Sequence, residues 1–97
     1  MTSIKLVLAE LLPDTASRES GALLRNMILE HLQQEILLEI DIGHTALTPS
    51  FADEAFGLLC HHLSMKEFNQ KIKFIHLSPT HKTLLLRVLS NRFSSPR

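Results

Sequence analysis

Three short segments of the chain alternate apolar and polar positions, and this period of two residues predicts three strands. In each segment the apolar side chains share one face, as Ile72 and Phe74 do in the last one. The strands are expected at residues 4–8, with the apolar pattern running on to Leu12 before the turn Pro13-Asp14, at residues 35–42, and at residues 71–77.

Between and after these segments, apolar residues recur every three or four positions, which predicts three helices. The first begins after the capping residue Ser17 and ends near residue 34, with Gly21 allowing a close helix contact. The second covers residues 51–63. The third begins at Ser78-Pro79, a capping serine followed by proline at the first helical position. The expected core positions of the helices are Leu24, Met27, Ile28, His31 or Leu32, then Ala52, Ala55, Phe56, Leu59 and Leu63, and finally Leu85, Val88, Leu89 and Phe93.

The resulting order, β-α-β-α-β-α, predicts an α/β fold with right-handed crossovers and a small, mostly parallel or mixed sheet. Acidic side chains on the second strand and lysines on the third indicate that one sheet face is thinly covered, so the helices are expected mainly on the other face. If these strands are neighbours, Glu39 lies opposite Lys71 or Lys73. We expect one domain over residues 1–97, with a frayed tail at residues 94–97.

Composition narrows the range of partners. The chain has 97 residues, and ten basic and ten acidic side chains give a formal net charge of zero. This balance argues against nucleic acid or an anionic membrane as the partner, because both require a concentrated basic surface. No signal peptide opens the sequence, and no apolar stretch approaches the ~20 residues that cross a bilayer. A cytoplasmic location is therefore expected.

The residue types that carry catalysis or bind metals do not form a recognisable motif. His61 and His62 are adjacent, so on a helix their side chains diverge by ~100° and do not share one ion comfortably. Cys60 is the only cysteine, which rules out an intrachain disulfide and favours a small buried side chain. The three glycines are scattered, so no phosphate-binding loop is present. We expect no metal, no cofactor and no catalytic residues.

The most informative segment is Thr48-Pro49-Ser50-Phe51-Ala52-Asp53-Glu54, which is typical of a helix start. Ser50 and Asp53 are three residues apart, so the serine is expected to cap the helix and the aspartate to return a hydrogen bond. The segment also follows a buried strand, where open α/β sheets place functional residues. A phosphate on Ser50 is favoured by the neighbouring helix amides but repelled by Asp53 and Glu54.

These residues also resemble a known family. The stretch from Ile36-Leu37-Leu38-Glu39-Ile40-Asp41 through Ser50-Phe51-Ala52-Asp53-Glu54 to Phe56-Gly57-Leu58-Leu59 looks like the small bacterial STAS-like domains of unknown function. Ser17-Arg18-Glu19 and residues 87–92 are similar to the same pattern.

The resemblance implies a relative of the STAS fold, which occurs in anti-anti-sigma factors and at the ends of anion transporters. Such domains bind proteins, often histidine-kinase-like ATPases, and some are switched by phosphorylation at this helix start. Carried over, Ser50 is the candidate phosphorylation site, with Thr48 nearby. The segment departs from the phosphorylated Asp-Ser-Ser-Gly pattern, because Pro49 stands in place of the aspartate and Phe51 follows the serine.

The leading hypothesis is a non-catalytic regulatory domain that binds a partner protein, with a histidine-kinase-like ATPase as one candidate. It predicts that Ser50→Asp or Phe51→Ala abolishes binding without unfolding the domain. The expected contact residues, beside the loop of residues 43–50, are Thr48, Ser50, Phe51, Asp53 and Glu54.

Two alternatives stay open. In the first, the chain is an oligomeric assembly subunit whose half-polar sheet face or first strand contacts a second copy. In the second, it is a small ligand- or nucleotide-binding protein or an enzyme.

Overall fold

The strands and helices follow one another as the sequence pattern predicts. Two short helices are additional, at residues 8–11 and 65–71, and the second predicted helix is divided in two. A computed structural model describes residues 2–93, so the expected frayed tail at residues 94–97 lies outside the described residues. The elements are β1 (Ser3–Val7), α1 (Leu8–Leu11), α2 (Arg18–Leu32), β2 (Leu37–Asp41), α3 (Pro49–Ala55), the 3₁₀ helix η1 (Gly57–His61), α4 (Met65–Lys71), β3 (Ile72–Ile75) and α5 (Pro79–Phe93).

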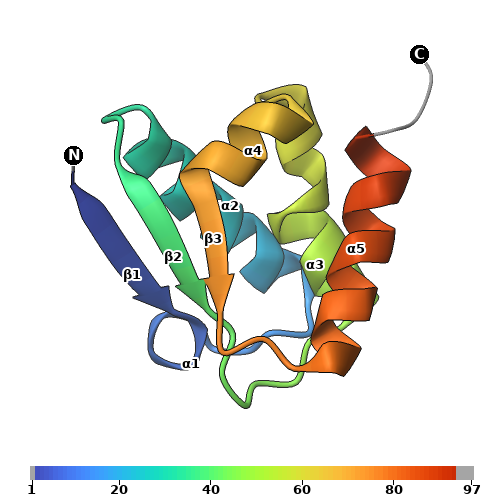
Figure 1. Ribbon diagram of the computed structural model, residues 1–97. Coiled ribbons are helices and arrows are strands. Elements are labelled where there is room, and N and C mark those ends of the chain that lie inside the picture. Colours follow the sequence, from blue (N-terminus) through green and yellow to red (C-terminus); the bar gives the residue numbers. More distant parts are fainter. Residues whose placement is uncertain (1, 94–97) are drawn as a thin grey trace.

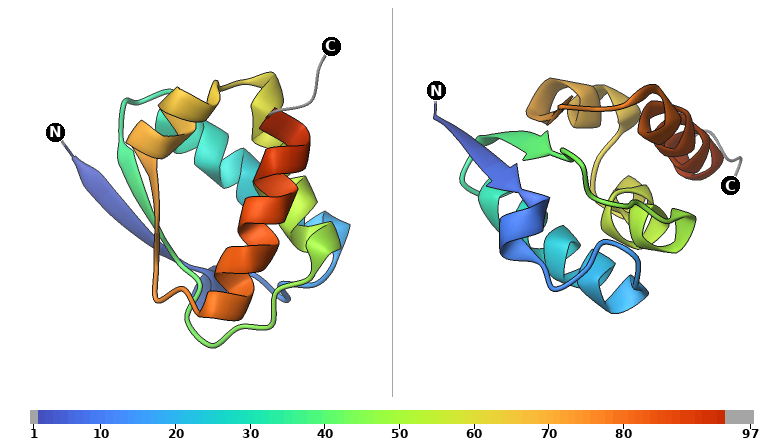
Figure 2. Two further views of the ribbon diagram at one scale, coloured as in Figure 1. Left: turned by 45° about the vertical axis from the view of Figure 1, so that its right-hand side comes forward. Right: turned by 90° about the horizontal axis from the view of Figure 1, so that it is seen from below.

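The three strands form one parallel sheet in the order β1-β2-β3. Each crossover moves one strand along the sheet in the same direction, and two right-handed crossovers of this kind place their helices on the same face. Figures 1 and 2 show α2 and α3 packed behind the sheet, with α5 beyond α3. The predicted α/β fold with helices mainly on one face is therefore confirmed, and the described sheet is entirely parallel.

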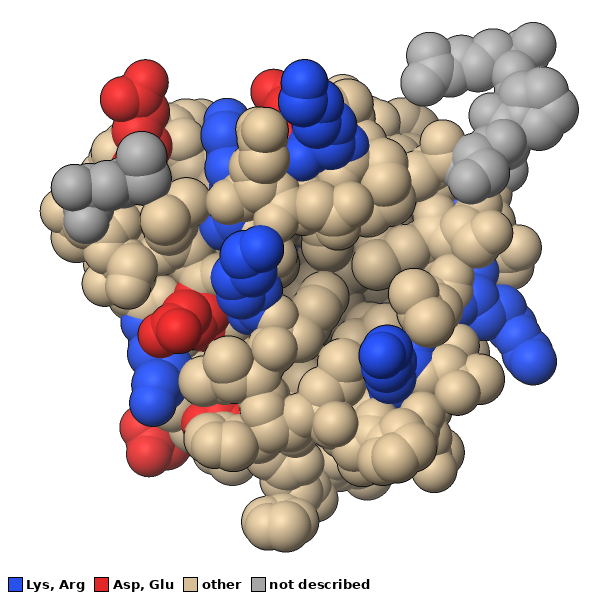
Figure 3. All heavy atoms as spheres, in the orientation of Figure 1, with Lys and Arg blue, Asp and Glu red and all other residues tan. Residues whose placement is uncertain are grey.

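The other face of the sheet is open and carries a row of charges (Figure 3). Glu39 of β2 is in register with Lys5 of β1 on one side and Lys73 of β3 on the other. This arrangement confirms Lys73 as the residue opposite Glu39, whereas Lys71 ends α4. Alternating charge signs across neighbouring strands favour this register by a fraction of a kcal/mol per pair, about 0.2–1.

The core lies between the sheet and the helices, and its aromatic rings connect the two layers. Leu38 and Ile40 of β2 are fully buried, and so is Ile42, which directly follows this strand. The Phe56 ring makes edge-to-face contacts with Phe51, at a centroid distance of 6.3 Å, and with Phe74, at 5.0 Å. This aromatic contact links α3 to β3 through the core.

Two predicted elements end earlier than expected, and strand pairing explains the first of them. Residues 8–11 form a helical turn rather than more strand, because Val7 is opposite Asp41, the last residue of β2. A strand that continued past Val7 would have no partner on β2. The chain forms the helical turn α1 instead, which buries Leu8. The helix expected over residues 51–63 breaks after Ala55 and continues as η1.

The residues between the second predicted helix and the third predicted strand, for which no element was expected, form the helix α4. Ser64 accepts a hydrogen bond from the Glu67 amide at 3.1 Å, and the Glu67 carboxylate accepts one from the Ser64 amide at 2.9 Å. This reciprocal pair is a capping box, which also places Phe68 in the core. The same serine-to-acid spacing is visible in the sequence, but the low apolar content of the segment masks it.

Gly21 lies where α2 and α3 approach most closely, as the sequence suggested. A Cβ atom built on Gly21 would stand 2.8 Å from Cβ of Glu54 and 2.9 Å from the carbonyl oxygen of Phe51. Both distances are shorter than ordinary van der Waals contact. The close approach of the two helices therefore depends on glycine at this position.

Candidate docking surface at the start of helix α3

Helix α3 is capped by Thr48, two residues earlier than predicted. The Thr48 hydroxyl accepts a hydrogen bond from the Phe51 amide at 3.1 Å, and Pro49 occupies the first helical position. Ser50 is therefore already inside the first turn. The predicted capping pair of Ser50 and Asp53 is wrong. The helix is capped by Thr48, which accepts from the Phe51 amide, and the Asp53 carboxylate accepts hydrogen bonds from Arg92.

Thr48 is also bonded to the loop that precedes α2. Its hydroxyl donates to the carbonyl of Ala16 at 2.6 Å, and its amide donates to the carbonyl of Thr15 at 3.4 Å. The Thr15 hydroxyl in turn donates to the carbonyl of Ala46. These hydrogen bonds hold the residues that precede α3 against the residues that precede α2, so the relative position of the two helix starts is fixed.

The start of α2 is itself stabilised by a carboxylate. The Asp14 side chain accepts from the amides of Ser17 and Ala16, at 2.7 and 2.9 Å, and from the hydroxyls of Ser17 and Ser20. The amide bonds favour the charged form and hold the pKa of Asp14 at about 2. Asp14 thus stays ionised at any ordinary pH and can keep accepting these hydrogen bonds at the start of α2.

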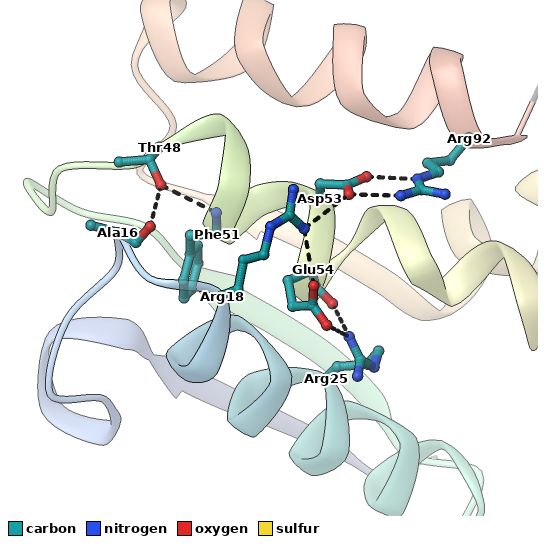
Figure 4. A network of polar contacts seen from close by, with 8 residues as sticks. All are labelled: Ala16, Arg18, Arg25, Thr48, Phe51, Asp53, Glu54 and Arg92. Carbon is teal, nitrogen blue, oxygen red and sulfur yellow. Dashed lines mark hydrogen bonds and ion pairs between the residues drawn. The ribbon is translucent and has the colours of Figure 1, made fainter.

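Asp53 and Glu54 face arginines from two other helices (Figure 4). Arg92 of α5 donates to both carboxylate oxygens of Asp53, at 2.7 and 2.8 Å. Arg18 of α2 contacts Asp53 at 3.4 Å and Glu54 at 3.0 Å. Arg25 of α2 pairs with the Glu54 carboxylate at 2.9 Å and also donates to the Glu54 carbonyl.

These ion pairs change the charge of the site. Bonding to Arg92, and then to Arg18, lowers the pKa of Asp53, while bonding to Arg25, and then to Arg18, lowers the pKa of Glu54. Three guanidinium groups thus surround two carboxylates. The repulsion expected between these acids and a phosphate on Ser50 is therefore offset by neighbouring positive charge.

None of the three arginines is among the site residues predicted from the sequence. Each is separated from its acidic partner by between 29 and 39 residues, so no local spacing connects them. By local pattern alone, Arg92 fits a solvated helix face. Only the family pattern, which includes Ser17-Arg18-Glu19 and residues 87–92, draws attention to Arg18 and Arg92.

The five predicted contact residues divide into exposed and buried groups. Ser50 is exposed, and its hydroxyl makes no hydrogen bond to any of residues 2–93. Thr48 is half-buried and already bonded, and Asp53 and Glu54 each keep 19% of the side chain exposed beside their arginines. Phe51 is fully buried, so its side chain is not presented at the surface of the described structure, unlike Ser50. Its ring packs inward because Phe51 lies, with Ala52 and Ala55, on the apolar face of α3 that is turned toward the core.

One hollow adjoins this segment at Pro49, and a second lies elsewhere on the surface. One, of about 390 Å³, lies between α3 and α5 and is lined by Pro49, Thr80, Thr83, Leu84, Arg87 and Val88. The other, of about 620 Å³, lies at the carboxyl ends of the strands. There His76, whose φ of 55° is in the left-handed region, places Nδ1 2.9 Å from the Asp41 carboxylate. We call Ser50, Pro49 and the α5 residues of the first hollow the docking surface.

The cap assignment predicts different effects for the two hydroxyl residues. Thr48→Ala is expected to lower the free energy of unfolding by about 1–2 kcal/mol, because the α3 cap and the bond to Ala16 are both lost. Ser50→Ala is expected to change it by less than ~0.5 kcal/mol. Urea denaturation followed by circular dichroism measures both. Equal effects, or a larger one for Ser50→Ala, would show that the cap lies at Ser50.

Within residues 2–93, no three or more His, Cys, Asp or Glu side chains are grouped closely enough to hold a metal ion. No helix in this part of the chain has the length and apolar character needed to cross a membrane.

Comparison with known protein families identifies one that matches the chain. A family model described as a STAS-like domain of unknown function, DUF4325, matches residues 20–82. Searches of curated proteins and of solved structures returned no match. The matched region runs from the first turn of α2 to the first turn of α5. It contains Pro49, Ser50 and Thr80 of the docking surface, whereas the other α5 residues of that surface lie beyond it. The chain belongs to the family of STAS-like domains of unknown function.

Proposed function

We propose that this domain is a non-catalytic regulatory module that binds a partner protein through the docking surface. The observation that supports it most directly is the contrast between two neighbouring hydroxyls. The Thr48 hydroxyl accepts a hydrogen bond from the Phe51 amide and donates one to the Ala16 carbonyl, which holds the start of α3 in place. The Ser50 hydroxyl is exposed and makes no hydrogen bond to the described residues. A rigid segment that presents a free hydroxyl suits recognition, because little conformational entropy is lost on binding.

A histidine-kinase-like ATPase is the partner class that we propose. The support comes from the STAS-like family, since the STAS domains that the sequence resembles often bind such ATPases. The docking surface adds a physical argument. It combines the apolar edges of Pro49 and Leu84 with Arg87, the mixture of apolar and arginine side chains that is frequent at protein interfaces.

We further propose that phosphorylation of Ser50 switches this interaction. A phosphate adds roughly −1.5 to −2 charges to the docking surface. The carboxylates of Asp53 and Glu54 are already paired with Arg18, Arg25 and Arg92, so the modified segment retains a favourable electrostatic environment. Thr48 is the poorer acceptor, because modifying its hydroxyl breaks the α3 cap and the bond to Ala16.

The test uses the full chain and purified histidine-kinase-like ATPases encoded in the same genome. Isothermal titration calorimetry compares wild type with Ser50→Asp and with Ser90→Asp, a matched charge at an exposed serine on α5. Ser50→Asp is expected to weaken binding about tenfold or more, equivalent to at least ~1.4 kcal/mol, and Ser90→Asp to leave it unchanged. Binding that is absent for wild type, or weakened equally by both variants, would contradict the proposal. Circular dichroism of each variant confirms that the fold is retained.

A further inference from the structure

A second recognition feature lies on the opposite side of β3 from β2. A groove of about 610 Å³ runs between β3, α4 and α5. Its apolar lining consists mainly of Phe68, Ile72, Leu77, Leu85, Leu86 and Leu89. Leu86 is 59% exposed, the largest exposed fraction among the large hydrophobic side chains of residues 2–93. We call this feature the β3 groove.

The groove exists because α5 leaves the edge of the sheet uncovered. Helix α5 packs mainly against α3 and η1 rather than against β3. Strand β3 is the last strand of the described sheet, so no strand pairs with its outer edge. Figure 2 shows α5 standing away from β3, and Figure 3 shows a hollow on the face of the molecule between them.

The backbone of β3 is oriented to pair with another strand. The carbonyl of Ile75 accepts a hydrogen bond from the amide of Ile42, so Ile75 directs its polar groups toward β2. In a parallel strand the backbone groups of successive residues point alternately to the two sides. The amide and carbonyl of Phe74 therefore point away from β2, toward the groove. An added strand can satisfy both groups.

The charges around the groove indicate what kind of strand fits. Lys73 and Lys82 line it, and none of the described residues that line it is acidic. In Figure 3 the hollow is flanked by basic side chains, while the acidic side chains of that face lie away from it. A second copy of this chain paired through the same edge would bring the Lys73 and Lys82 side chains of both copies into one groove. Like charges in that position oppose the pairing.

We propose that the β3 groove binds an extended acidic segment of a partner protein, which adds to the sheet as a strand beside β3. Main-chain hydrogen bonds to Phe74 supply affinity, and alternate side chains of the segment enter the apolar groove. Acidic side chains between them pair with Lys73 and Lys82 and set the specificity. None of the residues lining the groove belongs to the docking surface, so this interaction requires neither Ser50 nor its phosphorylation.

The experiment selects ligands from random sequences, so the partner does not have to be identified first. A phage library of random peptides of about twelve residues, long enough to extend past β3 at ~3.3 Å per residue, is panned against the full chain. Enriched peptides are synthesised, and their dissociation constants are measured by fluorescence anisotropy. We expect sequences in which apolar and acidic residues alternate. Hydrogen exchange of the Phe74 amide, followed by NMR, is expected to slow when such a peptide binds.

Matched variants separate the groove from the rest of the surface. Leu86→Asp and Lys82→Glu are each expected to weaken peptide binding about tenfold. Leu23→Asp on α2 and Lys66→Glu on α4 introduce the same changes at exposed positions outside the groove and are expected to have no effect.

Three results would overturn the proposal. The first is a library that yields no binder, or only basic ones. The second is binding that is equally sensitive to the variants inside and outside the groove. The third is a concentration-dependent dimer with a protected Phe74 amide in the absence of peptide, which would assign the groove to a second copy of the chain.

Discussion

Phe51→Ala is expected to lower the free energy of unfolding by about 3–5 kcal/mol, the largest effect of any substitution proposed for this protein. The Phe51 side chain is fully buried between α3 and the sheet and makes an edge-to-face contact with Phe56. Truncation removes the buried ring and leaves a cavity that the surrounding helices fill only in part. Because small domains are stable by about 5–15 kcal/mol, this loss is a large share of the total.

Urea denaturation measures this effect, and far-ultraviolet circular dichroism is the suitable signal because the chain contains neither Trp nor Tyr. Leu23→Ala is the control, since Leu23 is 48% exposed and its truncation is expected to change stability by less than ~0.5 kcal/mol. If Phe51→Ala does not fold at all, Phe51→Leu keeps the prediction testable, with an intermediate loss expected. A Phe51→Ala domain as stable as wild type would contradict the described core.

This result matters for locating the partner surface. A loss of binding in Phe51→Ala reports the loss of folded protein, since the side chain has no exposed area. Ser50→Asp tests the docking surface directly, because Ser50 is exposed and its substitution leaves the Thr48 cap in place.

Gly21→Ala is expected to lower the free energy of unfolding by about 1–3 kcal/mol, although alanine is normally the better helix residue by about 1 kcal/mol. The new methyl group would stand 2.8 Å from Cβ of Glu54 and 2.9 Å from the carbonyl oxygen of Phe51. Neither atom can rotate away, because one belongs to the backbone and the other is attached directly to it. The helices α2 and α3 must separate, which also lengthens the ion pairs of Glu54 with Arg25 and Arg18.

Two further variants test this explanation by the same denaturation experiment. Asn26→Ala, at an exposed position of α2, is expected to be neutral or slightly stabilising, because only helix propensity changes. Gly57→Ala is expected to cost less than Gly21→Ala, because the nearest atoms there all belong to side chains and none to the backbone: Oδ1 of Asp53 at 2.7 Å, Cγ of Arg92 at 3.0 Å and Cγ1 of Val88 at 3.2 Å. Equal stability of Gly21→Ala and wild type would show that α2 and α3 move apart freely.

Local signals predicted the element order well. Ser17 caps α2 by accepting from the Ser20 amide, and Ser78 accepts from the His81 amide at the start of α5, both as expected. Caps and periodicity depend only on residues within one or two turns, so the tertiary structure is not needed to recognise them. The same reasoning applied to Thr48-Pro49 would have identified the α3 cap, because it repeats the hydroxyl-proline pattern of Ser78-Pro79.

The pairing of β1 with β2 could not be read locally. The apolar pattern continues beyond Val7 to Leu12, but β2 offers no residue opposite those positions. The length of a strand is limited by its partner as well as by its own sequence. For this reason residues 8–11 form a helical turn and do not extend β1.

The sequence by itself determined the three strand-helix units, the face of each strand that is buried and the one-sided arrangement of the helices. These follow from periodicity, caps and the right-handedness of parallel crossovers. Only the tertiary structure decided that Asp53 and Glu54 are paired with Arg18, Arg25 and Arg92, and that α5 leaves the edge of β3 uncovered. Both features depend on how separate elements meet in space, and contacts between residues some 30 to 40 positions apart leave no local pattern in the chain.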